Sequence, residues 1–299
     1  MLHVLTHNIL PVFAMLALGF VMGRLGTAKQ DEARAINRIA FLVLQPPLIF
    51  MLLTGLDLPA VHFDAIGIYF GVEVIAFAVA FSVARILFRC DPAEAFLLGM
   101  CVVFVNSLLY IWPISTLIYG EDGARPISAI VALDASVSFA FFIIGIELIK
   151  GGRGVATALP KLIRNPVLIT IVLSLALNLA RVPIPEPLAT AARFAGAGAA
   201  PLTLFALGVV LSAAPLKPDG PVVAITTLKL VVFPVLVWIG FLSLSPENPW
   251  QDQFLLNAGG PAGAMAFSLA LLHGVRTDRI APVIIWTSVL SLVTLAWLA

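Results

Sequence analysis

The stretch Asn106-Ser107-Leu108-Leu109-Tyr110-Ile111-Trp112-Pro113 interrupts an apolar segment that runs from Phe96 to Gly120. About half a chain later, Asn257-Ala258-Gly259-Gly260-Pro261-Ala262-Gly263 interrupts a second such segment in the same way. Asn, Gly and Pro in the middle of a membrane helix leave backbone groups unpaired, which is tolerated only where protein or a water-filled cavity surrounds them. Two matched interruptions therefore predict a transporter whose central binding site lies between them.

The composition excludes a soluble protein. Hydrophobic residues make up 61% of the chain, charged residues only 11%, and the mean hydropathy is +1.08, whereas a soluble domain carries about 25% charged residues. The two cysteines are too few for a disulfide framework. The four histidines lie at or beyond the ends of predicted spans rather than as a group within one span. We therefore expect no metal site and no cofactor beyond a coupling sodium ion or proton.

Ten segments satisfy the requirement of about 20 mostly apolar residues for a membrane-spanning helix. The predicted spans are 7–25, 34–55, 64–88, 93–119, 124–149, 165–180, 187–212, 220–243, 251–273 and 279–298. The sixth is short, and Asn165-Pro166 at its start is typical of an N-cap followed by a first-turn proline. The chain is thus predicted to be an all-α polytopic membrane protein.

The positive charges predict the orientation of these spans. Of the 17 Lys and Arg residues, 13 fall in one set of alternate loops and three in the other. Because cytoplasmic loops are enriched in Lys and Arg, we expect both termini on the non-cytoplasmic side of a bacterial inner membrane. The link between the fifth and sixth spans, which contains Arg153, is then cytoplasmic.

The two halves of the chain share a pattern. Four pairs of short motifs recur in order, 154 to 158 residues apart: Asn8 with Pro11 and Asn165-Pro166, Pro47-Leu48 and Pro201-Leu202, Phe96-Leu97-Leu98 and Phe254-Leu255-Leu256, Gly120 and Gly274. A five-helix unit has its ends on opposite sides of the membrane, so its copy must be inverted. We predict two inverted repeats, 1–150 and 165–299, in which the interrupted fourth and ninth helices cross.

The interruptions supply the candidate substrate site. The outgoing half-helices are predicted to begin near Pro113 and Pro261, and the partial positive charge of their N-termini suits an anion. The candidate substrate-binding residues are Asn106, Ser107, Tyr110, Pro113, Asn257, Gly259, Gly260, Pro261 and, from the second span, Gln45. Two proline kinks packed against neighbouring helices remain the alternative interpretation.

Three charged residues fall near the middle of predicted spans, where charge is costly and often functional. Glu73 and Lys229 are 156 residues apart and so occupy roughly equivalent positions in the two repeats, and Asp134 lies midway along the fifth span. The carboxylates could form a proton or sodium site whose charge Lys229 balances. A static buried ion pair that fixes helix register is the alternative.

Several short stretches resemble the auxin efflux carrier family, which includes plant auxin exporters and bacterial carriers of malonate and malate. They are Pro201-Leu202-Thr203-Leu204-Phe205-Ala206-Leu207-Gly208, Lys229-Leu230-Val231-Val232-Phe233-Pro234 and Pro261-Ala262-Gly263-Ala264-Met265-Ala266-Phe267. The resemblance implies a fold similar to bile-acid symporters and sodium–proton antiporters. It also implies a dimerising scaffold (7–55 plus 165–212, helices 1, 2, 6 and 7) and a mobile transport unit (64–149 plus 220–298).

The crossover residues of that family would map onto Asn106, Pro113 and Pro261. The plant exporters carry a fuller Asn-Pro motif, whereas here Asn106 precedes Pro113 by seven residues and Asn257 precedes Pro261 by four. This difference argues against auxin itself as the substrate.

Together these features predict an elevator-type carrier that moves a small organic anion across the bilayer, coupled to a proton or another ion, and that has no nucleic-acid partner. A cation–proton antiporter centred on Asp134 and a membrane sensor that transports nothing are the competing interpretations. An enzyme is disfavoured, because adjacent acidic residues such as Glu121-Asp122 fall in predicted loops outside the spans.

Overall fold

The computed structural model describes residues 1–151 and 155–299, and within them every regular element is a helix. Seven helical runs are long and apolar enough to cross a membrane: Leu2–Arg24, Gln30–Thr54, Phe63–Leu87, Arg125–Ile149, Glu186–Leu211, Gly220–Leu244 and Ile280–Leu298. Each run coincides with a predicted span. The chain is a polytopic membrane protein, as its composition predicted.

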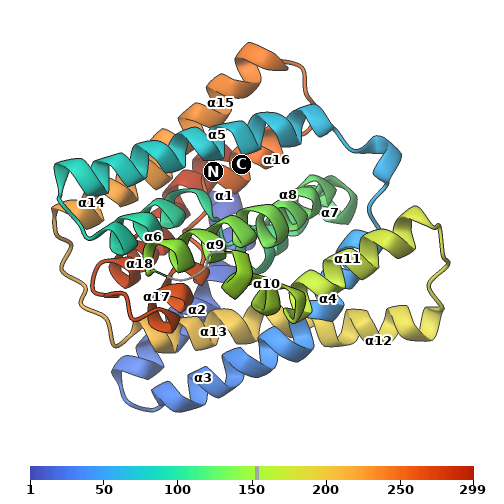
Figure 1. The fold of residues 1–299 in the computed structure, drawn as a ribbon. Helices are drawn as coiled ribbons and strands as arrows, with labels where there is room; N and C mark the ends of the chain where they lie inside the picture. The colour runs from blue at the N-terminus through green and yellow to red at the C-terminus, as the bar shows by residue number, and fades with distance from the viewer. Residues whose placement is uncertain (152–154) are drawn as a thin grey trace.

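These runs divide into the helices labelled in Figure 1 and several π-turns. The first four runs contain α1 (Leu2–Val4), η1 (Leu5–Ile9), α2 (Leu10–Arg24), α3 (Gln30–Ile39), η2 (Ala40–Leu44), α4 (Gln45–Thr54), α5 (Phe63–Ser82), η4 (Val83–Leu87), α8 (Arg125–Leu133), η6 (Asp134–Ser138) and α9 (Phe139–Ile149). The last three contain α12 (Glu186–Ala197), α13 (Ala199–Leu211), α14 (Gly220–Thr227), η7 (Leu228–Val232), α15 (Phe233–Leu244) and α18 (Ile280–Leu298).

The other predicted spans are short or interrupted helices. They are α6 (Pro92–Val103) with η5 (Ser107–Ile111) and α7 (Trp112–Gly123), α11 (Pro166–Leu179), and α16 (Gln251–Ala258) with α17 (Met265–Leu272). A 3-10 turn, η3 (Leu58–Ala60), lies between the second and third runs, and α10 (Val155–Ile163), which the sequence did not predict, lies in the central link. Gly152 and Arg153 of that link lie outside the described residues.

The interrupted helices lie between two groups of long helices. In Figure 1, α5, α14 and α15 run along the top of the view and α3, α13 and α12 along the bottom, with α6, α9, α17 and α18 between them. The main packing pairs are α2 with α13, α4 with α11, and α5 with α6 and α15. This arrangement surrounds the two interruptions with protein.

Small residues allow α2 and α13 to pack closely. A Cβ atom added to Gly19 would lie 2.0 Å from the Phe205 carbonyl oxygen, and one added to Gly208 would lie 2.1 Å from the Leu16 carbonyl oxygen. Gly23, four residues after Gly19, faces the side chain of Ser212, the residue that follows α13. Such small-residue spacing is common where membrane helices touch through their backbones.

Four π-turns have a proline two residues after their last residue. η1 precedes Pro11, η2 precedes Pro46, η5 precedes Pro113 and η7 precedes Pro234. A proline in a helix clashes with the carbonyl four residues before it, and in all four cases that carbonyl belongs to the π-turn. The wider turn accommodates the ring, so these prolines bend the helix without ending it.

Candidate functional site

The two interruptions lie antiparallel to each other at the centre of the molecule. Val105 and Ala262 form an isolated β-bridge. The Asn106 amide donates to the Pro261 carbonyl at 3.1 Å, and the Gly263 amide donates to the Phe104 carbonyl at 2.8 Å. The unwound backbone of each interrupted helix is thus paired with that of the other.

α18 satisfies further backbone groups of the second interruption. The Ala262 amide donates to Thr287 Oγ1 at 3.1 Å, and Thr294 Oγ1 donates to the Gly259 carbonyl at 2.8 Å. Lys229 Nζ donates to the Ala258 carbonyl at 2.6 Å, at the C-terminal end of α16. These bonds explain how non-helical backbone is stable in the interior of a membrane protein, where unpaired backbone groups are costly.

The outgoing half-helices do not begin where the prolines predicted. Helical backbone resumes at Ser107, six residues before Pro113, because η5 accommodates that proline within a continuous helix. In the second interruption it resumes at Met265, four residues after Pro261. Gly120 and Gly274, the predicted ends, both have left-handed backbone, with φ of 75° and 61°.

A cavity of about 440 Å³ lies against the crossing. One wall consists of α3, η2 and α4, with α11 and α13 beside them, and the other consists of the two interruptions with α8, η6 and α9. Its polar lining residues are Arg34, Asn37, Arg38, Gln45, Asn106, Ser107, Asp134, Asn165, Thr203 and Ser268. Aliphatic and aromatic side chains supply most of the rest. This is the size and lining of a small-molecule site.

The cavity separates the predicted substrate residues into two groups. Gln45, Asn106 and Ser107 line it. The remaining six are not among its lining residues: Tyr110, Pro113, Asn257, Gly259, Gly260 and Pro261. The Tyr110 side chain is fully buried, and Asn257 Nδ2 donates to the Tyr69 hydroxyl at 2.8 Å, so both support the crossing from within the protein.

Glu73, Asp134 and Lys229 come together from three different spans. Ser107 Oγ donates to Asp134 Oδ2 at 3.2 Å, and Ser138 Oγ donates to Glu73 Oε2 at 3.4 Å. The two carboxyl groups are close enough to interact electrostatically with each other, and both also interact with Lys229. Of the three, only Asp134 also lines the cavity.

The second oxygens of this carboxyl pair, Glu73 Oε1 and Asp134 Oδ1, are buried without a donor in the described part of the chain. Two adjacent carboxyl groups in such surroundings do not both ionise readily, and a shared proton relieves their repulsion. The Lys229 ammonium, which also sits 4.8 Å from the centre of the Phe233 ring, adds compensating charge. The arrangement can therefore hold a proton or a small cation next to the cavity.

Sequence reasoning missed several lining residues. Arg34 and Arg38 were assigned to membrane orientation alone, although their spacing with Phe41 and Gln45 places them on one helix face. Thr203, 5% exposed, has an Oγ1 without a hydrogen-bond partner in the described chain and also lines the cavity. The helical spacing of 34, 38, 41 and 45 was the signal that could have revealed this face.

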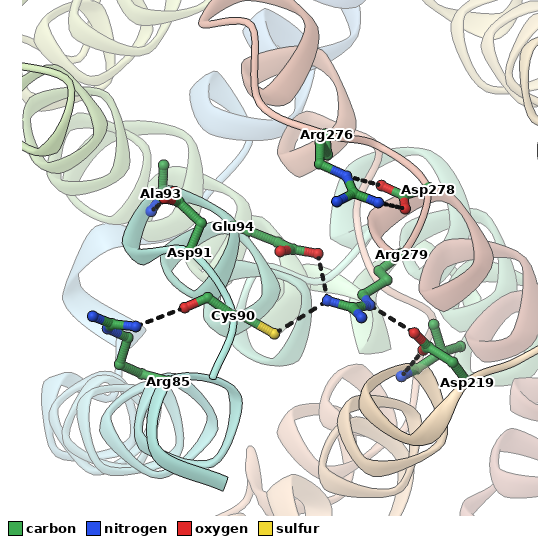
Figure 2. Close-up of polar contacts among 10 residues, drawn as sticks. Arg85, Cys90, Asp91, Ala93, Glu94, Asp219, Arg276, Asp278 and Arg279 are labelled. Atoms are coloured by element: carbon green, nitrogen blue, oxygen red, sulfur yellow. Dashed lines mark hydrogen bonds and ion pairs between the residues drawn. The ribbon is translucent and has the colours of Figure 1, made fainter. Parts of the chain in front are cut away.

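A second polar cluster lies away from the cavity and joins the N-terminal ends of three helices (Figure 2). Arg279, which precedes α18, donates to Glu94 Oε1 of α6 at 3.1 Å and to Asp219 Oδ2 at 2.6 Å, and its Nη1 lies 3.6 Å from Cys90 Sγ. Asp219 also caps α14 through the Val222 amide at 3.1 Å. The bond to Asp219 raises the pKa of Arg279 above its usual range.

We expect Arg279→Met to destabilise the protein by about 3 kcal/mol, because the Glu94 side chain, only 6% exposed, would lose the guanidinium that compensates its charge. Thermal unfolding of the detergent-solubilised protein measures this. Arg276→Met is the matched control: its partner Asp278 is 2.6 Å away, but the Arg276 side chain is 76% exposed and should contribute little. Equal melting temperatures for the two variants would contradict the assignment.

The whole chain matches a family model described as "Membrane transport protein", over residues 4–155 and 153–298. The chain belongs to this family, that of the auxin efflux carriers. A Rhizobium meliloti (strain 1021) protein named "Putative malonate transporter" is 26% identical over 303 aligned residues, covering 98% of this chain and 94% of the relative. The family and this relative indicate a membrane transporter rather than an enzyme.

A second relative comes from Methanothermobacter thermautotrophicus and is named "Uncharacterized transporter". It is 24% identical over 296 residues, with 97% of this chain and 96% of the relative covered. Both similarities span essentially the entire chain, so the interruptions and the cavity fall within the related region.

Proposed function

We propose that the chain is a secondary carrier for a small organic anion, a mono- or dicarboxylate. The observation that carries the proposal is the position of the cavity at the start of both outgoing half-helices. Residues 107–109, the first of η5, and Gly263, Ala264 and Met265, at the start of α17, all line it. First-turn amides have no partner within their own helix, and together with the helix dipole they favour an anion.

The packing supports ten membrane spans in two inverted repeats. α2 of the first span packs on α13 of the seventh, and α4 of the second span packs on α11 of the sixth. These are the two contacts that a two-fold axis relating the repeats would exchange. α5 and α15, from the equivalent third and eighth spans, pack on each other, as helices beside such an axis do.

An elevator-type mechanism accounts for the location of the cavity between two groups of helices. α3, α4, α11 and α13 belong to the predicted scaffold, and the interruptions, η6 and α9 belong to the predicted transport unit. Movement of the second group against the first would carry an anion bound at the crossing from one side of the membrane to the other. A homodimer through helices 1, 2, 6 and 7 would hold the scaffold still.

Asp134 would couple the transport of the anion to the transport of a proton. It lines the cavity next to Ser107, so an ionised Asp134 and a bound carboxylate would repel each other strongly in surroundings of low dielectric. The anion is then favoured when the Glu73 and Asp134 pair carries a proton. Lys229 would limit the charge that remains once this proton leaves.

Uptake of radiolabelled malonate and other small carboxylates into proteoliposomes tests the proposal. We expect Asn106→Ala to reduce uptake about tenfold or more, since a lost hydrogen bond to a charged group costs about 1.5–3 kcal/mol. Ser107→Ala should act similarly by releasing Asp134. Ser174→Ala is the control, because Ser174 is equally buried in α11 but does not line the cavity.

If all three variants take up every carboxylate as the wild type does, the assignment of Asn106 and Ser107 to the binding site is wrong. If the wild type transports no carboxylate and sodium alone drives proton flux, the protein is a cation–proton antiporter centred on Asp134.

One observation favours this antiporter over a membrane sensor that transports nothing. The neighbours of Asp134 in sequence, Ala135 and Ser136, are not acidic, but the fold places Glu73 beside it. A pair of buried carboxyl groups is a suitable cation or proton site. The two arginines among the cavity's lining residues weigh against a cation as the transported species and support the anion carrier.

A further inference from the structure

We propose that Arg34, Asn37 and Arg38 of α3 form an anion-capture site at the mouth of the cavity, through which the substrate carboxylate reaches the crossing. The inference rests on the proposed carrier function and extends it to residues that neither the interruptions nor the carboxyl pair include. All three side chains line the cavity.

Burial along the cavity defines which end is the mouth. Arg34 and Arg38 are exposed and Asn37 is half-buried. At the other end, Gln45 is 8% exposed, Ser107 3% and Asp134 3%. An anion entering from solvent therefore meets two guanidinium groups before it meets the buried polar groups of the crossing.

The geometry of α3 and the following turn favours this role. Positions 34, 37, 38, 41 and 45 follow helical spacing and all line the cavity, so the arginines continue the face that carries Gln45 further in. The face is basic at its outer end and neutral towards the centre.

The arginines are free to bind a ligand. The only ion pair of Arg34 within the described chain joins it to Asp31 at 3.3 Å, with side chains 66% and 93% exposed, so solvent screens it. Arg38 makes no ion pair with any described residue. Guanidinium groups bind carboxylates through two parallel hydrogen bonds, and an amide such as Asn37 can add a third.

The distribution of charge gives the site a direction. Asp134 is the only acidic residue lining the cavity in the described chain, and it lies at the buried end, whereas the basic pair lies at the mouth. Basic residues at the entrance raise the local concentration of anions. Because α3 belongs to the predicted scaffold, the capture site would stay in place while the transport unit moves. It should therefore affect the affinity for substrate more than the maximal rate.

The test measures malonate binding to the full-length protein in neutral detergent and malonate uptake by proteoliposomes. We expect the double variant Arg34→Gln/Arg38→Gln to bind malonate about tenfold more weakly and to have a correspondingly higher KM, with kcat within about twofold of wild type. Arg34→Lys/Arg38→Lys keeps the positive charge, so its affinity for malonate should fall by about threefold or less. Raising the ionic strength from about 0.01 M to about 0.3 M should weaken malonate binding by the wild type. The same change should weaken malonate binding by the Gln variant less.

The matched control is Arg89→Gln/Lys217→Gln. It removes the same charge from two exposed residues on the same predicted side that do not line the cavity, and it should bind malonate like the wild type. If Arg34→Gln/Arg38→Gln keeps the affinity and salt dependence of wild type, the capture site is refuted while the carrier function stands.

Two further outcomes would also overturn the proposal. If the wild type binds none of the tested carboxylates, the carrier function fails and the capture site fails with it. If the arginine variant is impaired only in liposomes of anionic lipid and binds normally in detergent, the arginines bind lipid headgroups instead. Equal melting temperatures would show that all the variants are folded.

Discussion

Gly208→Ala is expected to leave little folded protein. The added Cβ would lie 2.1 Å from the Leu16 carbonyl oxygen and 2.7 Å from the Phe20 amide nitrogen, and both atoms belong to the backbone of α2. No side-chain rearrangement can relieve a clash with backbone, so α2 and α13 would have to move apart. Overpacking typically costs about 1–3 kcal/mol, and we expect at least the upper end here.

The measurement is the yield of monodisperse protein after detergent extraction, together with its melting temperature. Gly71→Ala is the control: Gly71 lies in α5, and no atom is within 4 Å of the position of its added Cβ. Alanine also favours a helix by about 1 kcal/mol over glycine, so this variant should be as stable as wild type or more so. Equal yield and melting for the two variants would show that α2 and α13 do not pack as described.

The long spans could be predicted because a single physical requirement determines them. A helix must present about 20 apolar residues to lipid, and the sequence shows this wherever a run is continuous. The contact between α2 and α13 is different. Gly19 and Gly23 have the spacing of a close-packing motif, but the partner helix that carries Gly208 is almost 190 residues away in sequence. Hydropathy contains no information about that pairing.

The site was predicted less completely, for a local reason. Pro113 was expected to mark the start of a half-helix, but η5 accommodates its ring and moves that start to Ser107. The side chains facing the cavity shift accordingly: Asn106 and Ser107 line it, and Tyr110 does not. The π-turns recur before several prolines, so this shift follows a regularity that sequence reasoning can use in related chains.

For the charged residues too, the sequence reveals which residues matter, but their contacts depend on the packing of distant spans. Glu73, Asp134 and Lys229 were recognised because charge within a membrane span is costly. We also predicted that they act together, from their similar depth in three spans, but which atoms meet could not be derived because it depends on how the three spans pack. Arg34 and Arg38 were interpreted only as determinants of orientation, since hydropathy does not distinguish a loop arginine from one that faces a cavity.

Lys229→Met is expected to abolish coupled transport and to destabilise the protein. The Lys229 side chain is fully buried, and its Nζ donates to the Ala258 carbonyl at 2.6 Å. Removing it leaves that carbonyl without its donor, and it takes from Glu73 and Asp134 the one ammonium that interacts with them in the described part of the chain. Breaking a buried charge pair by removing one partner typically costs about 3–5 kcal/mol.

A double-mutant cycle separates the electrostatic role from simple loss of packing. Methionine fills much of the volume of lysine, so Lys229→Met/Asp134→Asn should recover about half or more of the lost stability if the charges compensate each other. The double variant should still fail to accumulate malonate against a gradient, because Asp134 would no longer bind and release a proton. Stability that does not recover would mean that Lys229 acts mainly on α16 through Ala258, and accumulation at the wild-type rate in either variant would remove both residues from the coupling mechanism.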